Sequence, residues 1–133
     1  MSHVIPRLLS KALRSKDGFL EVYSPNHTRT FCYIDDAVEL IARVAEVEEH
    51  NATFNIGSID QEITIFDLAR IIIKEVNPSL KIKVMADTEG SPTRRCPDMG
   101  ATIKSTGYAP QVSIEEGVKN TWDWYKKYYF PRT

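Results

Sequence analysis

Apolar side chains recur every three or four residues in several stretches of the chain, which is the pattern of an amphipathic helix. This spacing predicts helices at residues 3–14, in the segment after Asp36, at 65–76 and at 114–130. Between them, short runs rich in apolar and β-branched residues predict strands at 19–23, 53–58 and 81–85 and a further extended piece at 29–34. The predicted elements are therefore a mixture of helices and short strands.

Two of these helices carry a polar pair at their start. Thr64 with Asp67, and Ser113 with Glu116, have the spacing at which a hydroxyl accepts the backbone N–H three residues later. The last helix has one apolar side, formed by Ile114, Val118, Trp122 and Tyr125. Its aromatic residues have few basic neighbours, which favours packing over stacking on nucleic-acid bases.

The helix near residue 36 has an acidic start. Asp35 or Asp36 could cap it, because a carboxylate accepts the unpaired N–H groups of a first helical turn. The residues expected to face inward are Val38, Ile41, Ala42 and Ala45.

Composition and charge exclude several classes of protein. The 133 residues suit one compact domain. With 17 Lys and Arg against 18 Asp and Glu, the net charge of -1 does not favour nucleic acid or an anionic membrane as a partner. No apolar run is long enough to span a membrane, the two cysteines lack C-x-x-C spacing, and the amino terminus shows no signal-peptide pattern. We therefore expect a cytoplasmic protein.

The order of elements favours an α/β fold, of the kind found in small α+β-like lobes. About four to five helices would combine with several short strands, too few for a complete doubly wound sheet. The sequence has no G-x-G-x-x-G or P-loop motif, no Tyr followed four positions later by Lys, and no Ser-centred nucleophile elbow. We therefore expect no catalytic group in this chain.

The segment Ser91–Gly100 holds the first candidate binding residues. Prolines on either side of Arg94 and Arg95 restrict the backbone, so we expect a stiff, extended loop. Two guanidinium groups match the oxygens of a diphosphate, and Asp98 could accept hydrogen bonds from a sugar hydroxyl. The alternative is a solvated arginine pair, with Asp98 capping a short helix.

Arg29 is a second candidate, because it lies between two threonines ahead of an aromatic, partly apolar segment. The alternative for Arg29 is an ion pair with Asp35 or Asp36 at a strand edge. His3 and His27 have no partner at metal-ligand spacing, so we expect no metal site.

Four segments, taken in order, resemble the C-terminal half of extended short-chain dehydrogenase/reductases that act on nucleotide sugars. They are HVIPRLL, VYSPNHTRTFCYIDDAVELI, FNIGSIDQEITIFDLARII and SPTRRCPDMGATIKSTGYAPQVSIEEGVKNTWDWY. This NAD-dependent epimerase/dehydratase group includes epimerases, 4,6-dehydratases and UDP-glucuronate decarboxylases. The resemblance covers nearly the whole chain, and the order and separation of the four segments carry it.

The resemblance implies that residues 1–133 form one nucleotide-sugar-binding domain, and that the family's N-terminal Rossmann domain is absent from this chain. In the family, that lobe binds NAD(P) and carries the catalytic Ser/Thr and Tyr-x-x-x-Lys groups. We therefore expect no bound cofactor and no catalysis by this chain alone. The implied partners are a nucleotide-diphosphate sugar and the missing Rossmann lobe, in cis or in trans, and a homodimer is a further expectation.

The resemblance also assigns roles to the candidate residues. Arg29 matches the family arginine that contacts the nucleotide diphosphate. Arg95 and Asp98 match an R-x-x-D pair in which the arginine holds phosphate and the aspartate holds ribose, with Arg94 as a further candidate. The prolines would then fix the arginines at the mouth of a cleft between two lobes.

Two more positions follow from the resemblance. His3 stands where many relatives have an asparagine near the phosphates, which is a departure from the family pattern. Tyr23 ends the strand that borders the base.

Two functions are open at this point. One is the binding lobe of an epimerase or dehydratase, with the base, the sugar and the reaction unassigned. The other is a stand-alone interaction module that kept the shape of the lobe without its catalysis. Both predict an exposed apolar patch, because a Rossmann lobe would normally cover it.

Overall fold

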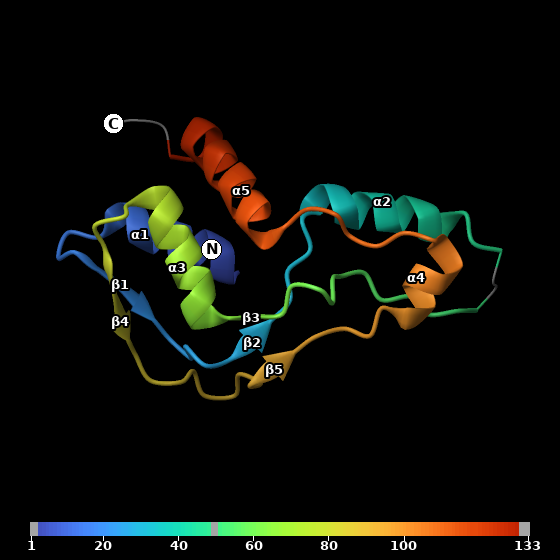
Figure 1. Cartoon of the computed structure of the whole chain (residues 1–133), viewed down its shortest axis with the longest axis horizontal. Helices are drawn as coiled ribbons and strands as arrows, with labels where there is room; N and C mark the ends of the chain where they lie inside the picture. Colours follow the sequence, from blue (N-terminus) through green and yellow to red (C-terminus); the bar gives the residue numbers. More distant parts are fainter. Residues whose placement is uncertain (1–2, 49–50, 131–133) are drawn as a thin grey trace.

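The computed structural model describes residues 3–48 and 51–130. The elements along the chain are α1 (Val4–Arg14), β1 (Phe19–Val22), β2 (Thr28–Arg29), α2 (Ile34–Ala45), β3 (Ile63–Thr64), α3 (Ile65–Val76), β4 (Lys81–Val84), β5 (Arg94–Arg95), α4 (Gly100–Thr106) and α5 (Ile114–Tyr128). They form the small mixed α/β lobe that the sequence predicts (Figure 1). Within the described ranges, no helix combines the length and apolar character needed to cross a membrane.

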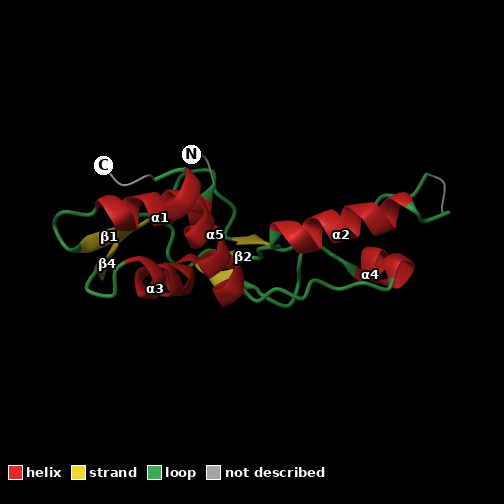
Figure 2. Cartoon of the chain, turned by 90° about the horizontal axis from the view of Figure 1, so that it is seen from above, coloured by secondary structure: helices red, strands yellow, loops and turns green. Residues whose placement is uncertain are grey.

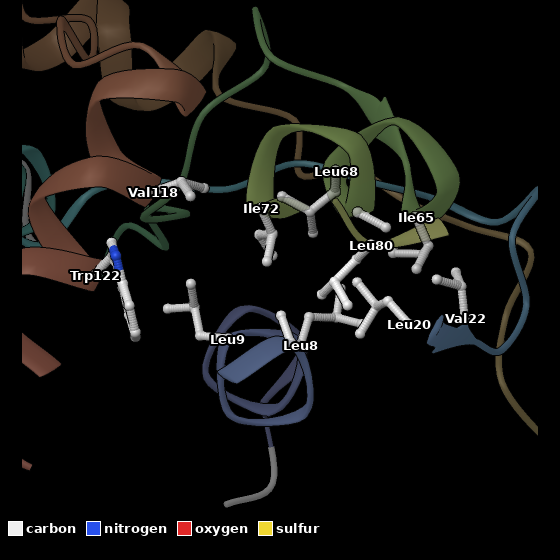
Figure 3. Close-up of a cluster of buried hydrophobic side chains, with 12 residues drawn as sticks. Leu8, Leu9, Leu20, Val22, Ile65, Leu68, Ile72, Leu80, Val118 and Trp122 are labelled. Atoms are coloured by element: carbon white, nitrogen blue, oxygen red, sulfur yellow. The ribbon is translucent and has the colours of Figure 1, made fainter. Parts of the chain in front are cut away.

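The main body is a parallel pair of strands packed with three helices. β1 pairs with β4, and Leu20 lies opposite Ile82. α1 and α3 contact each other and β1, and α5 contacts α3 (Figure 1). Figure 3 shows one core formed by side chains from these elements and from the loop before β4, namely Leu8, Leu9, Leu20, Val22, Ile65, Leu68, Ile72, Leu80, Val118 and Trp122. Burial of this apolar surface is the main force that holds the body together.

The polar pairs predicted at the helix starts are present. Thr64 Oγ1 accepts the Asp67 N–H at 3.0 Å and donates to the Asp67 carboxylate at 2.7 Å. Ser113 Oγ accepts the Glu116 N–H at 3.2 Å. These bonds satisfy N–H groups that a first helical turn leaves unpaired, so α3 and α5 begin where the sequence predicts.

The aromatic residues of α5 divide between the core and the surface. Trp122 is buried, and its ring lies 6.3 Å from that of Phe130. Trp124, Tyr128 and Tyr129 are exposed. The packing role expected of these aromatic residues therefore holds only for the buried side of α5.

A small second sheet joins the body to an arm. Its order is β3-β2-β5, with β2 antiparallel to β3 and parallel to β5, and each strand is two residues long. Beyond the sheet, α2 and α4 contact each other and extend away from the body (Figure 2). We call α2, α4 and residues 51–58 the arm.

The structure corrects the expected orientation of α2. The four residues predicted to face inward are all exposed: Val38, Ile41, Ala42 and Ala45. Val38 and Ile41 are each 56% exposed, and α2 buries Asp36 and Leu40 instead. The expectation is wrong because no described element covers the apolar side of this helix.

The structure also corrects the expected cap of α2. The helix begins after Tyr33, and no side chain in the described part of the chain caps it. The Asp36 carboxylate instead accepts the Tyr108 hydroxyl at 2.6 Å and the N–H groups of Gln111 at 3.0 Å and Val112 at 2.9 Å. Asp36 therefore ties the arm to the segment that leads into α5.

Two segments expected to be extended differ from the prediction. Residues 53–58 form no strand, and none of their backbone groups bonds to another backbone group within the described ranges. The piece at 29–34 is a strand only at Arg29, since Ile34 already begins α2. A strand needs a neighbour for its ladder of hydrogen bonds, and a β-prone sequence does not supply one.

Candidate functional site

The pairing of β2 with β5 brings two predicted binding residues together. Thr28 pairs with Arg94, and Arg29 pairs with Arg95, in a parallel register. Because side chains alternate between the two faces of a strand, Arg29 and Arg95 share one face while Thr28 and Arg94 share the other. Two guanidinium groups from distant parts of the sequence thus lie on the same side of the sheet.

Neighbouring groups hold the Arg29 side chain in place. Its Nη1 donates to Thr28 O at 2.7 Å, and its Nη2 donates to Ser91 Oγ at 3.0 Å and to Pro92 O at 2.8 Å. Burial and then the positive charge of Arg95 lower the pKa of Arg29 from its ordinary value. Arg29 stays protonated, since arginine keeps its proton in proteins. Like charges placed side by side repel, and a bound anion would relieve that repulsion.

The guanidinium of Arg95 has no partner among the residues that the structure describes. Its side chain is exposed, and it makes no hydrogen bond or ion pair with residues 3–48 or 51–130, in contrast to Arg94. The pair therefore combines a fixed guanidinium with an accessible one.

A cavity of about 480 Å³ opens beside Arg29. Its walls come from α1, β1, β2 and the start of α3 and from the loops after β1 and β4, and they include Arg7, Lys11, Tyr23 and Arg29. The Lys11 ammonium lies 4.8 Å from the centre of the Tyr23 ring. The volume suits a small organic ligand. The three cations outnumber the two carboxylates that also line the cavity, Glu21 and Asp87, so the lining favours an anionic ligand.

His27 forms a buried part of the cavity wall. It is only 5% exposed, and its Nδ1 has no hydrogen-bond partner among the described residues. Its Nε2 lies 3.9 Å from the carboxylate of Asp87, which also lines the cavity. A polar group of a ligand could satisfy the unpaired nitrogen.

Arg94 is directed away from Arg95 and is already occupied. Its Nε and Nη2 donate to the two carboxylate oxygens of Glu62, each at 2.8 Å. This is the bidentate geometry in which arginine and carboxylate pair best.

Asp98 and its loop are fixed to the arm. Asp98 Oδ1 accepts the N–H of Gly100, the first residue of α4, at 2.8 Å, and Asn55 Nδ2 donates to Asp98 O at 2.7 Å. A Cβ at Gly57 would lie 2.8 Å from Pro97 Cγ, so glycine is needed for this close approach. The N-cap position of α4 is Met99 and not Asp98, but Asp98, one residue earlier, bonds the first N–H of the helix with one carboxylate oxygen.

Other residues stand apart from the prediction or were missed by it. His3 immediately precedes α1 and is exposed, and its side chain makes no cap hydrogen bond to a described residue. Arg7 and Lys11 line the cavity without having been predicted, although their i, i+4 spacing on the polar side of the first helix was a readable signal. Glu62 was also missed, and no local pattern marks it.

Sequence comparisons relate the chain to a known family. The model of the NAD dependent epimerase/dehydratase family matches residues 1–57. UDP-glucuronic acid decarboxylase 5 of Arabidopsis thaliana is 33% identical over 116 residues, which are 86% of this chain and 33% of that protein. UDP-N-acetyl-alpha-D-glucosaminuronate decarboxylase of Bacillus cytotoxicus is 32% identical over 131 residues, covering 93% of this chain and 40% of that protein. The chain thus spans well under half the length of these curated relatives.

Solved structures share the fold. UDP-glucuronic acid 4-epimerase from Bacillus cereus, in complex with UDP-glucuronic acid and NAD, superposes with a TM-score of 0.83 at 24% identity. That match covers 96% of this chain and 41% of the epimerase chain. UDP-glucose 4-epimerase from Thermotoga maritima, with UDP-glucose, gives a TM-score of 0.82 at 22% identity, covering 94% of this chain and 40% of that one. With the sequence matches, these findings confirm the resemblance: the chain belongs to the NAD-dependent epimerase/dehydratase family.

Proposed function

We propose that this chain is the nucleotide-sugar-binding lobe of an NAD-dependent enzyme that modifies the sugar by hydride transfer. The proposal rests mainly on the pairing of Arg29 with Arg95. Arg29 also lines a cavity, together with Tyr23. The names of the relatives support a UDP-sugar as ligand. Among the reactions of the family we favour decarboxylation, because both curated relatives described above are decarboxylases.

Arg29 and Arg95 would share the diphosphate. Three hydrogen bonds already hold the Arg29 side chain, so it would lose little conformational entropy on binding an anion. Arg95 brings exposed donors from the neighbouring strand. A hydrogen bond to a charged group contributes about 1.5–3 kcal/mol when sheltered from water. The ligand would also remove the repulsion between the two arginines.

The remaining candidates take different parts in this proposal. Tyr23 would border the base from the cavity wall. Asp98 would offer a ribose hydroxyl the carboxylate oxygen that does not bond to α4. His3 would lie near the phosphates, at the start of α1. We assign Arg94 to support of β5, because Glu62 occupies its guanidinium.

NAD would belong to a second lobe. The sequence has no glycine-rich phosphate loop and no Tyr-x-x-x-Lys, so the residues of this chain do not fit NAD. We place both in a Rossmann lobe, in cis or in trans, which would cover the exposed side of α2 that carries Val38 and Ile41. Binding of the remote nucleotide by this chain would position the sugar for the other lobe.

Calorimetric titration with UDP, dTDP, CDP and GDP, and with NAD for comparison, tests the proposal. We expect saturable binding of one diphosphate, with UDP the first candidate, and a loss of about tenfold or more in affinity for Arg95→Ala. Arg70→Ala is the matched control, because it removes an exposed arginine of α3 that pairs with Asp67 and lies outside both the cavity lining and the β2–β5 pair. If a folded Arg95→Ala protein bound the diphosphate with unchanged affinity, the proposed nucleotide-sugar-binding role would be wrong.

The interaction module is the alternative, and the exposed side of α2 would serve it equally well. It predicts a folded chain that is indifferent to all four diphosphates. That result would favour a protein partner over a nucleotide.

A further inference from the structure

One carboxylate group links the strands of the small sheet, on the face opposite Arg29 and Arg95. Glu62 immediately precedes β3, at one edge of the order β3-β2-β5. Its Oε1 accepts the Thr28 hydroxyl of β2 at 2.6 Å, and its two oxygens accept Arg94 of β5 at 2.8 Å each. A single side chain therefore links all three strands.

The sheet needs such support, because its backbone pairing is short. Each strand has two residues, and the parallel β2–β5 pairing is continued by Thr28 N–H to Thr93 O at 2.8 Å and by a longer bond of 3.4 Å from Thr30 N–H to Arg95 O. Strands this short specify their register weakly. A shift by one residue would place Arg94, instead of Arg95, on the Arg29 face.

The bond between Glu62 and Arg94 is stronger than an ordinary surface ion pair. Isolated surface pairs contribute little, but bidentate pairing with a third donor is the favourable exception. The hydrogen bonds from Arg94 and Thr28 lower the pKa of Glu62, so the carboxylate stays ionised. On the opposite face, Arg29 and Arg95 carry like charges, and without a ligand their repulsion opposes the same pairing.

We propose that Glu62 is a positioning residue, which holds Thr28 and Arg94 so that Arg29 and Arg95 are presented side by side to the diphosphate. This inference rests on the proposed function. Glu62 acts through the register of β2 and β5 and does not touch the ligand.

The direction in which one substitution changes the UDP affinity distinguishes a positioning role from a purely electrostatic effect. Glu62→Gln removes a negative charge near an anion site, which by Coulomb's law alone would strengthen anion binding. Positioning predicts the reverse, a loss of about tenfold in UDP affinity measured by calorimetry. Glu39→Gln is the matched control, because Glu39 also pairs with an arginine, Arg43 on α2, and its loss changes the net charge equally.

A second measurement does not depend on the ligand. The Thr28 amide donates across β2–β5, so Glu62→Gln should speed its hydrogen exchange, while core amides such as that of Leu68 keep their protection. Equal or tighter UDP binding with an unchanged Thr28 amide, while Arg95→Ala still loses binding, would overturn the positioning role alone. If Arg29→Ala and Arg95→Ala also bind UDP normally, the proposed function itself fails.

Discussion

At the residue scale, one buried carboxylate fixes the arm to the chain that enters α5. Asp36 is 3% exposed and accepts three hydrogen bonds. Burial alone would raise the pKa of Asp36, but these bonds, that of the Tyr108 hydroxyl first, outweigh it and lower the pKa below its usual value. The same contact raises the pKa of Tyr108 to about 12. Asp36 is therefore charged at neutral pH, with its charge fully engaged.

Asp36→Asn should destabilise the chain by about 2 kcal/mol at neutral pH, because an amide cannot accept all of these bonds. Since the pKa of Asp36 is lower in the folded chain than in the unfolded one, its contribution is present above the unfolded pKa and is lost as the pH falls through the folded value. The difference between the variant and the unmodified chain should therefore shrink below about pH 4.

Urea unfolding at neutral and at acidic pH measures both effects. Asp35→Asn, at the exposed neighbouring position, is the control and should change little. A deficit of Asp36→Asn that stays the same at both pH values would show that its charge does not stabilise the fold.

At the element scale, some elements follow from local chemistry and others depend on distant partners. α3 and α5 could be predicted because each has a capping pair and a buried apolar stripe. The pairing of Arg29 with Arg95 could not, because nothing in either segment specifies the other. α2 is a helix as predicted, but the side that was expected to be buried is exposed. The apolar pattern shows which side of a helix is suited to burial. Whether that side is buried depends on a second element that packs against it.

The exposed side of α2 should therefore tolerate polar residues in this chain. Val38→Ser with Ile41→Ser should leave the free energy of unfolding within about 1 kcal/mol, since both side chains are exposed. Leu40→Ala, one position from Ile41 but fully buried, should cost about 2–4 kcal/mol. Urea unfolding compares the three proteins. A loss in the double variant as large as that of Leu40→Ala would mean that this face is covered in the folded chain.

At the scale of the whole molecule, the fold brings cations from α1 and β2 to one cavity and pairs the cation on β2 with one on β5. The resemblance predicted six binding residues, His3, Tyr23, Arg29, Arg94, Arg95 and Asp98. The structure pairs Arg29 with Arg95 in the sheet, and Arg29 and Tyr23 line one cavity. Arg94 is engaged by Glu62, Asp98 bonds the first N–H of α4, and His3 lies at the start of α1. Arg7 and Lys11 were not predicted to line the cavity, because their position there depends on where α1 packs. Glu62 was missed because its contacts cross three strands that the sequence does not pair.

The central claim is that Arg29 and Arg95 act together on one diphosphate. The most direct test is the UDP affinity of Arg29→Ala, Arg95→Ala and the double variant, with Arg70→Ala as control and circular dichroism to confirm the fold. We predict that each single change weakens binding by about tenfold or more, that the double variant is non-additive because both groups hold one ligand, and that Arg70→Ala binds normally. Folded single variants that bind UDP as well as the unmodified chain would contradict the account.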